Sequence, residues 1–474
     1  MKSTGVCVKT TSIRTVIYME SVGTKIIATV GPACSDLETL HALVKAGADG
    51  FRINCSHTKP GEIATLVKLL KTAGAGFIIA DLQGPKLRLL EPVKARAGDR
   101  VIFGEGGVKL SHKVFKVGSG VVSFKDGSIF GNLLGVKDGG YEIEFAAGVD
   151  LPQGSAIHLP GAVLEGGCVG EKDEADLEEA VSAGVEWVAL SYVSDAEDAK
   201  KGYDLVNKRC GVIAKIEKAS ALEDLRNINK VVDAIMIARG DLGVELDYSK
   251  VPSAQREIFN QCRKDGVPVV CATEMLGSMV SEPRPTRAEV GDVEGVVRNE
   301  YDALVLTAET AMGKDPVAVV RAAARIREVA ETEKRSATDG TRLLNNRRVF
   351  ENRGDTVLAS AAVEVADSIK AEAIVALTST GHTAKLVARA RPRTMVYAVS
   401  FNPEVARRAG LYYGVVPMLE TRGATIEESS DLVLKKLKKS GKIQTSDTVV
   451  FIGSRTGPEQ DADVVMIRTV SSKH

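Results

Sequence analysis

Eight short runs of β-branched and apolar residues, most of them followed by an amphipathic helical stretch, constrain the fold of this 474-residue chain more than any other feature. Parallel strands connected by crossover helices produce this alternation. Eight such units with short connections predict a (β/α)₈ TIM barrel, an α/β fold. The runs are Lys25–Val30, Gly50–Cys55, Phe77–Asp81, Val185–Ser191, Gly211–Glu217, Asp233–Ala238, Val267–Thr273 and Asp302–Thr307.

Two of the helical stretches show where they begin. Ser35, with Glu38 three residues later, predicts a capped helix over Ser35–Ala46. Pro316 predicts the first turn of a helix over Pro316–Glu331, because proline fits the first turn of a helix.

Residues 89–165 interrupt the barrel pattern after its third strand. They hold 14 glycines in 77 residues, and stretches such as Tyr141–Phe145 alternate apolar with polar side chains. Glycine-rich turns and period-two alternation predict a small inserted all-β domain, which we expect to be a β-barrel. The insertion follows the carboxyl end of a strand, where a barrel places its active site, so we expect this domain to cover the active site as a lid. A passive insertion would have the same pattern.

The pattern changes again towards the C-terminus. A charged, irregular stretch at Lys334–Arg353 is followed by a helix at Thr356–Lys370 and by five further strand-like runs. We expect a C-terminal α/β domain with a doubly wound sheet. The predicted boundaries are an N-terminal tail at 1–22, a catalytic barrel at 23–88 and 166–340, the lid at 89–165 and a regulatory domain at 341–474.

The balance of charges argues against nucleic-acid and membrane partners. Lysine plus arginine and aspartate plus glutamate each number 62, and no basic run occurs. The seven cysteines are scattered without a Cys-x-x-Cys pair, which is typical of reduced thiols. No apolar stretch has membrane-spanning length, and no signal peptide is evident. We therefore expect a cytoplasmic protein.

Polar residues gather at the carboxyl ends of the predicted strands. A barrel places its active site at that rim, and packing gives no reason for polar side chains there. The candidates in chain order are Arg52, Asn54, Asp81, Ser191, Lys215, Glu217, Arg239, Asp241, Thr273, Thr307 and Glu309.

Lys215 is the most informative of these candidates because it lies in an otherwise apolar strand. Glu217, two residues on, shares its face. A buried structural ion pair explains the two residues about as well as a catalytic role does. The following strand ends in Arg239-Gly240-Asp241, for which we expect a flexible turn. Glu217 and Asp241 would offer two oxygen ligands to Mg²⁺ or Mn²⁺. This set suits stabilisation of a transferring phosphoryl group and a developing enolate.

Seven segments of the chain together resemble the pyruvate kinase family, from about Gly23 to the C-terminus. Their order and spacing cover the whole predicted barrel. The segments are Thr24–Cys34 (TKIIATVGPAC), Arg52–His57 (RINCSH), Asp81–Arg88 (DLQGPKLR), Lys215–Glu217 (KIE), Ala238–Glu245 (ARGDLGVE), Cys271–Leu276 (CATEML) and Leu306–Ala311 (LTAETA).

The resemblance implies phosphoryl transfer from phosphoenolpyruvate to ADP, giving pyruvate and ATP, and it implies residue roles. Lys215 would stabilise the phosphoryl group and the enolate, and Arg52 would contact the phosphoryl group. Glu217 and Asp241 would hold the divalent ion. The remaining substrate contacts would come from Ser191, Arg239, Gly240, Asp241 and Thr273, with the amides around Gly240–Asp241 and the Thr273 hydroxyl binding the carboxylate. Thr273 and Thr307 would take part in protonating the enolate. The nucleotide contacts would come from Asn54, His57 and Arg88.

Lys86 is a departure from many relatives, which carry an acidic residue there and need potassium. The resemblance places the potassium site near Asn54, Ser56, Asp81 and the carbonyl of Leu82. A lysine ammonium can supply the missing monovalent charge. We therefore predict activity without added potassium, the alternative being that Lys86 points to solvent.

Two further features concern the outer domains. Leu151–Gly161 (LPQGSAIHLPG) lacks the lysines that relatives place in the lid, so a nucleotide-phosphate contact is expected to be absent or supplied elsewhere. The C-terminal segment Thr378, Ser379, Thr380, Gly381, His382 and Thr383 resembles the family's site for phosphorylated effectors, although a plain helix cap would have the same composition. Family members are usually homotetramers, so the same assembly is expected.

Two other classes of protein stay open at the level of sequence. A phosphoenolpyruvate- or pyruvate-handling lyase on the same barrel would also use metal-binding carboxylates and an arginine. It would not need the lid or the nucleotide-side residues. A non-catalytic sensor of phosphorylated metabolites is the third possibility, but it would have no need of Lys215, Glu217, Asp241 and Thr273 together.

Overall fold

A computed structural model describes residues 23–336 and 354–473, apart from 119, 126–128, 138, 166, 422, 424 and 456–460. The predicted tail at 1–22 lies outside the described residues. Eight parallel strands form a closed barrel in the order β1-β17-β16-β15-β14-β13-β3-β2. This confirms the predicted TIM barrel. Its strands are β1 (Lys25–Thr29), β2 (Gly50–Asn54), β3 (Ile78–Asp81), β13 (Trp187–Leu190), β14 (Gly211–Ile216), β15 (Ala234–Ala238), β16 (Val269–Ala272) and β17 (Ala303–Leu306).

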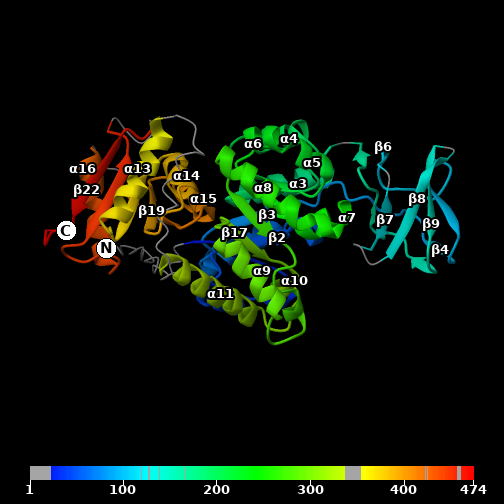
Figure 1. Cartoon of the computed structure of the whole chain (residues 1–474), viewed down its shortest axis with the longest axis horizontal. Helices are drawn as coiled ribbons and strands as arrows, with labels where there is room; N and C mark the ends of the chain where they lie inside the picture. Colours follow the sequence, from blue (N-terminus) through cyan, green and yellow to red (C-terminus); the bar gives the residue numbers. More distant parts are fainter. Residues whose placement is uncertain are drawn as a thin grey trace, which may run out of the picture.

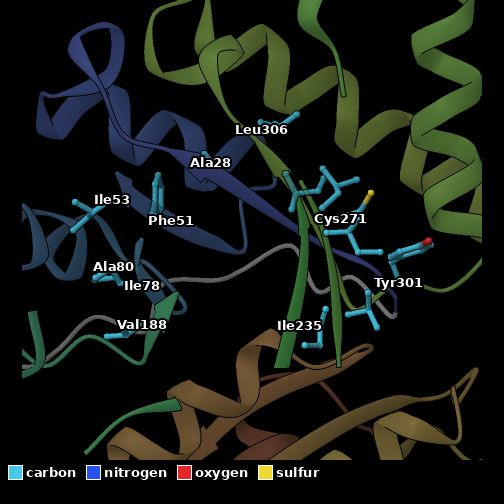
Figure 2. Packing of buried hydrophobic residues seen from close by; sticks show 14 of the residues in the cluster. Ala28, Phe51, Ile53, Ile78, Ala80, Val188, Ile235, Cys271, Tyr301 and Leu306 are labelled. Atoms are coloured by element: carbon cyan, nitrogen blue, oxygen red, sulfur yellow. The ribbon is translucent and has the colours of Figure 1, made fainter. Parts of the chain in front are cut away.

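Side chains alternate between the inside of the barrel and the layer beneath the helices, because successive residues of a strand point to opposite faces. On β14, Ile213 belongs to the cluster that fills the barrel, whereas Ala214 and Ile216 pack under the helices. Lys215 therefore points into the barrel. Figure 2 shows part of the outer layer, including Phe51 and Ile53, which flank Arg52 on β2.

Helices cover the outside of the barrel. Short 3₁₀ turns lie at Pro32–Cys34 (η1), Cys55–His57 (η2), Tyr248–Lys250 (η3) and Gly277–Val280 (η4). The helices are α1 (Leu37–Ala46), α2 (Glu62–Ala73), α3 (Glu171–Ala183), α4 (Ala196–Val206), α5 (Ala219–Glu223), α6 (Leu225–Val231), α7 (Arg239–Glu245), α8 (Val251–Asp265), α9 (Arg287–Arg298), α10 (Ala308–Ala311) and α11 (Pro316–Ser336).

Two local predictions were wrong. The N-cap of α1 is Asp36, whose Oδ1 accepts from the Thr39 amide at 2.8 Å, because Ser35 ends the preceding 3₁₀ turn instead. Residues Arg239–Glu245 form helix α7 and not a flexible turn. In that helix Asp241 and Glu245 are four residues apart and lie on neighbouring turns of the same face.

The insertion after β3 is built of antiparallel β-structure around its own apolar core, which includes Phe103, Phe124 and Phe145. It comprises a five-stranded sheet in the order β11-β7-β8-β9-β5 and two strand pairs, β4–β10 and β6–β12. The strands are β4 (Val93–Ala95), β5 (Arg100–Gly104), β6 (Val114–Lys116), β7 (Val121–Phe124), β8 (Ile129–Lys137), β9 (Gly140–Phe145), β10 (Val149–Leu151), β11 (Ile157–His158) and β12 (Val163–Leu164). The small all-β domain is confirmed.

The C-terminal part forms a separate sheet in the order β20-β19-β18-β21-β22, parallel except for β22. This confirms the predicted α/β domain. Its strands are β18 (Ala373–Leu377), β19 (Met395–Ser400), β20 (Val415–Leu419), β21 (Thr448–Gly453) and β22 (Val464–Thr469). Its helices are α13 (Gly354–Ser368), α14 (His382–Arg389), α15 (Pro403–Arg408), the 3₁₀ turn η5 (Ala409–Leu411) and α16 (Ile426–Lys439).

The three parts follow one another along the long axis of the molecule, with the barrel between the C-terminal sheet and the cyan lid (Figure 1). The C-terminal domain packs against the amino ends of the barrel strands. There the Trp187 indole donates to the carbonyl of Arg408 at 3.3 Å and meets the Tyr412 ring edge-on. The carboxyl rim consequently faces the lid. No helix in the described part of the chain has the length and apolar character that crossing a bilayer requires.

Candidate active site

Charged side chains from neighbouring strands meet at the carboxyl rim of the barrel. The Lys215 ammonium lies 3.0 Å from Glu217 Oε1 and 3.2 Å from Asp81 Oδ1, and it donates to Ser191 Oγ at 2.8 Å. Arg52 Nε lies 2.6 Å from the other Asp81 oxygen, Oδ2. β2, β3, β13 and β14 are consecutive in the barrel, so the sheet itself brings these groups together.

The charges of this cluster are buried but partnered. Burial alone would lower the pKa of Lys215, yet Asp81 and Glu217 together raise the pKa above its ordinary value. Burial would raise the pKa of Asp81, and Arg52 and Lys215 outweigh it, so the pKa of Asp81 is lowered. The rim therefore holds a permanent ammonium and a permanent carboxylate side by side at neutral pH.

Glu217 and Asp241 suit a divalent cation. Burial raises the pKa of Glu217, and repulsion from Asp241 raises it further, although Lys215 and the Tyr192 amide oppose both effects. The Tyr192 amide donates to Glu217 Oε2 at 2.6 Å. These two carboxylates repel each other. A hard divalent cation bound between them would remove this repulsion, so they form a suitable pair of oxygen ligands.

Thr273 and Gly240 lie together where β16 and β15 end. The Gly240 amide donates to Thr273 Oγ1 at 2.8 Å, and that hydroxyl donates to the Ala272 carbonyl at 2.7 Å. Thr273 and Glu274 both have left-handed backbone angles, with φ of 70° and 55°. Such angles cost non-glycine residues about 1–3 kcal/mol each and persist where the surrounding contacts enforce them.

Arg239 supplies those contacts. Its guanidinium donates to the Thr273 carbonyl at 2.7 Å, to the Glu274 carbonyl at 2.9 Å and to Asp292 at 2.8 Å. The side chain is buried. Arg239 thus holds the strained turn that carries Thr273, which is a positioning role that the sequence did not suggest.

Thr307 lies at the end of β17 with its hydroxyl 3.0 Å from Glu309 Oε2. The same oxygen accepts the Thr307 amide at 2.6 Å, and Glu309 Oε1 accepts the Leu276 amide at 3.2 Å. Glu309 is buried and links the loops after β16 and β17.

The predicted nucleotide-side residues lie around the loop after β2 and the hinge of the lid. Asn54 Oδ1 accepts the Ser56 amide at 3.3 Å, and His57 is exposed in η2. Arg88 donates to the Gly154 carbonyl of the lid at 2.9 Å. Arg88 therefore braces the lid in this structure, and its nucleotide role stays a prediction.

Two of the proposed monovalent-cation residues have partners within the protein. Asp81 is occupied by Arg52 and Lys215, and the Leu82 carbonyl accepts from Ser191 Oγ at 2.7 Å. Lys86 lines the cleft between lid and barrel, whose empty volume is about 620 Å³ and whose walls also include Asp241.

The sequence did not predict the contact that Glu245 makes with the lid in this cleft. Glu245 Oε2 lies 2.7 Å from His158 Nε2, and Glu245 Oε1 accepts the Gly161 amide at 3.1 Å. These contacts join the lid to α7, the helix that carries Asp241. The four-residue spacing of Asp241 and Glu245 would have indicated that both lie on one face of a helix, but a turn was predicted there instead of a helix.

The effector candidates lie at the start of α14. Thr378 Oγ1 accepts the Gly381 amide at 2.9 Å, and Thr380 Oγ1 accepts the His382 amide at 3.3 Å. Thr378 borders a pocket of about 550 Å³ in the C-terminal domain, together with Ser400, Thr425 and Arg455.

His382 has a partner that the sequence did not predict. Its Nε2 lies 2.9 Å from Asp355 Oδ2. With Asp461, these residues bring one potential ligand atom each to within 4.8 Å of one another.

A closed parallel barrel whose carboxyl rim combines a lysine, an arginine and several carboxylates beside a tethered lid suits an enzyme that acts on a phosphorylated anion, as phosphotransferases do. Comparison with known proteins agrees. The family model described as "Pyruvate kinase, barrel domain" matches residues 22–320, and "Pyruvate kinase, alpha/beta domain" matches residues 356–468. The chain belongs to the pyruvate kinase family.

Named relatives cover nearly the whole chain. A protein named pyruvate kinase from Agrobacterium vitis is 37% identical over 455 aligned positions, covering 90% of this chain and 92% of the relative. Another from Methylorubrum extorquens is 33% identical and covers 95% and 98%. One from Thermoplasma acidophilum is 32% identical and covers 90% and 79%.

Proposed function

We propose that the carboxyl rim carries out the pyruvate kinase reaction, in which the phosphoryl group of phosphoenolpyruvate moves to ADP and the resulting enolate is protonated to pyruvate. The observation that carries this proposal is the contact of Lys215 with Asp81 and Glu217 inside a barrel of this family. The cleft between the lid and the barrel, which Lys86 and Asp241 line, is the proposed nucleotide site.

The residue roles follow from charge and position. Lys215 and Arg52 present cationic groups at the rim, where they stabilise the transferring phosphoryl group and the enolate oxygen by electrostatics. Asp81 holds both cations in place through its two oxygens. Ser191, whose hydroxyl donates to the Leu82 carbonyl, accepts from the Lys215 ammonium and helps to fix its position.

The Gly240–Asp241 amides and the Thr273 hydroxyl form the proposed seat for the substrate carboxylate. Both amides lie in the first turn of α7, where amides have no acceptor within the helix, and the Gly240 amide donates to Thr273 Oγ1 and so fixes that hydroxyl beside the seat. Thr273 Oγ1 and Thr307 Oγ1 then pass a proton through water to the enolate carbon. Arg239 positions Thr273 and does not itself touch the substrate in this proposal.

Glu217 and Asp241 would hold the divalent metal, Mg²⁺ or Mn²⁺, which the family generally uses. When bound, the metal neutralises charge on the phosphoryl oxygens and on the enolate. Lys86 lines the cleft between the lid and the barrel, as Asp241 does. We propose that its ammonium supplies the monovalent charge that potassium supplies in other members of the family, so that added potassium is not required.

The nucleotide is proposed to bind under the lid, between Asn54, His57 and Arg88 on one side and the lid strands on the other. Assay of pyruvate formation with and without ADP tests this reaction against the lyase alternative. The proposal predicts that pyruvate forms only with ADP and a divalent metal present, in a one-to-one ratio with ATP. Pyruvate release that is independent of nucleotide would favour a lyase.

We also propose regulation and assembly of the family type. The pocket beside Thr378 combines hydroxyl groups with Arg455, which suits a phosphorylated effector.

We further propose that the protein forms a homotetramer, that its domains have the boundaries given above, and that it is located in the cytoplasm. The six described cysteines are free and buried, in keeping with a reducing compartment. Saturation curves with candidate effectors, and light scattering for mass, test these points.

A further inference from the structure

The turn that follows β13 has a backbone conformation that its sequence does not favour. Tyr192 lies in this turn with φ of 57°, in the left-handed region that residues other than glycine rarely adopt. Such a conformation costs free energy and persists where the surrounding contacts enforce it. The contacts of Tyr192 therefore show what this conformation is for.

The left-handed angle changes which way the chain faces after β13. Within the strand, Ala189 belongs to the cluster that fills the barrel, whereas Leu190 packs under the helices. Continued alternation would place Tyr192 under the helices and Val193 inside the barrel. Val193 instead packs under the helices, and half-buried Tyr192 lines the cleft between the lid and the barrel. The turn thus brings Tyr192 to the side of the active site.

The same turn directs the Tyr192 amide at a proposed metal ligand. This amide donates to Glu217 Oε2 at 2.6 Å, and the Lys215 ammonium lies 3.0 Å from Glu217 Oε1. A donor on each oxygen restrains the rotation of the carboxylate. A carboxylate offers about four lone-pair sites, so both oxygens can still coordinate a cation.

The Tyr192 ring packs against the turn that leads into the lid. A Cβ at Gly84 would lie 2.8 Å from Cδ2 of the ring and 2.9 Å from Ser191 Cβ, so a larger residue would displace the ring or the turn. Gly84 itself has φ of 69°, and its amide donates to Asp173 Oδ1 of α3 at 3.1 Å. Helix α3 therefore holds the turn on which the ring rests.

We propose that Tyr192 is a positioning residue for Glu217. Its left-handed backbone aims the amide at Glu217 Oε2, and its ring, seated on Gly84, holds that conformation. This inference rests on the proposed function, because it takes Glu217 as a ligand of the divalent metal. The partner of a metal ligand orients that ligand and so affects metal affinity without touching the metal. Since Tyr192 acts through its backbone, a residue that tolerates the left-handed angle should replace it better than one that does not.

Titration of the free protein with Mn²⁺, followed by electron paramagnetic resonance, tests the proposal on three variants that all lack the ring. Tyr192→Gly adopts the left-handed angle readily, Tyr192→Ala at some cost and Tyr192→Val at the greatest cost. Mn²⁺ affinity should fall in that order, with Tyr192→Val weaker than Tyr192→Gly by about tenfold or more. Tyr192→Phe keeps both the ring and the backbone and should bind Mn²⁺ as wild type does.

Lys208→Val is the matched control, because Lys208 is exposed, has φ of 60° and follows the end of α4. Its Mn²⁺ affinity should equal that of wild type. Circular dichroism checks that each variant folds. If Tyr192→Val does not fold, the comparison of Tyr192→Gly with Tyr192→Ala decides by the same order.

The outcomes separate this inference from the proposed function. Equal Mn²⁺ affinities of the Gly, Ala and Val variants, with weakened binding by Glu217→Gln in the same titration, would overturn the role of Tyr192 and leave Glu217 as a metal ligand. Unchanged Mn²⁺ affinity of Glu217→Gln would overturn both.

Discussion

At the scale of single residues, the rim is a compact set of opposite charges in which each cation meets at least one carboxylate. Lys215 faces two carboxylates, and Arg52 shares one of them. Asp241 repels the Glu217 carboxylate, and the Lys215 ammonium, 3.0 Å from Glu217, opposes this effect. The residue-level predictions concern these charges.

Glu217→Gln should weaken divalent-metal binding at least tenfold, because an amide oxygen is a poorer ligand than a carboxylate for a hard cation. Titration of the free protein with Mn²⁺, followed by electron paramagnetic resonance, measures this without any need for turnover. Glu223→Gln, an exposed carboxylate nearby on α5, should bind Mn²⁺ as wild type does. Unchanged Mn²⁺ affinity of Glu217→Gln would show that the metal is held elsewhere.

Lys86→Glu should make activity dependent on potassium. Wild type should lose little rate without potassium at constant ionic strength, whereas the variant should recover most of its rate only when potassium is added, since the lost ammonium must be replaced. Lys68→Glu on the exposed side of α2 controls for the change in net charge. A steep potassium dependence of wild type would contradict the assignment of Lys86.

The sequence could predict which residues meet at the rim but not what holds them. Lys215 and Glu217 follow from the two-residue period of a strand, and Asp81 and Arg52 follow from strand ends. The positioning role of Arg239 depends on the backbone angles of Thr273 and Glu274, which no local pattern encodes. The pairing of His382 with Asp355 joins residues 27 positions apart and required the packing of α13 and α14.

At the scale of elements, α7 connects the proposed metal ligand Asp241 to the lid. Asp241 lies in its first turn, and Glu245, one turn later, contacts His158 and the Gly161 amide. Burial would raise the pKa of Glu245, but His158 and the amides of Gly161 and Ala219 lower it below its ordinary value of 4.5. The stability that the contact of Glu245 with His158 and the Gly161 amide contributes is therefore fully present above pH 4.5, and it is lost as the pH falls through the lowered pKa of Glu245.

Glu245→Gln should loosen the lid. Its amide cannot accept from His158 and Gly161 as a carboxylate does, so hydrogen exchange of residues 157–161 should quicken and the KM for ADP should rise by about three- to tenfold, or roughly 1 kcal/mol. The KM for phosphoenolpyruvate should change less. Glu165→Gln on the exposed side of the lid is the matched control. Exchange rates equal to those of wild type would show that the contact does not tether the lid.

Element boundaries were predictable wherever the apolar runs were long. The eight barrel strands lie within two residues of the predicted runs at each end, and five strands follow in the C-terminal domain, as predicted. The two errors, at Ser35 and at Arg239–Glu245, both lie at the start of a helix. At Ser35 a 3₁₀ turn precedes the helix, at Arg239 the strand passes directly into the helix, and neither feature changes the apolar pattern.

At the scale of the whole molecule, buried ion pairs fasten the C-terminal domain to the amino end of the barrel. Arg391 with Asp302 and Arg407 with Glu186 both cross this boundary. Asp302 directly precedes β17, the strand that ends at Thr307. This arrangement joins the C-terminal domain to the rim through one rigid strand.

Arg391→Met should destabilise the protein by about 3–5 kcal/mol, because it leaves the buried Asp302 carboxylate without its cation. Chemical denaturation at pH 7 measures the change. Arg321→Met on the exposed face of α11 should alter stability by no more than about 0.5 kcal/mol. A loss of under 1 kcal/mol for Arg391→Met would mean that this pair does not hold the domains together.

Turnover of Lys215→Met tests the central claim most directly. With Lys230→Met, an exposed lysine of α6, as the control and with folding checked by circular dichroism, the account predicts that kcat falls at least a thousandfold, or about 4 kcal/mol in barrier. A folded Lys215→Met protein whose kcat stays within about tenfold of wild type would contradict it.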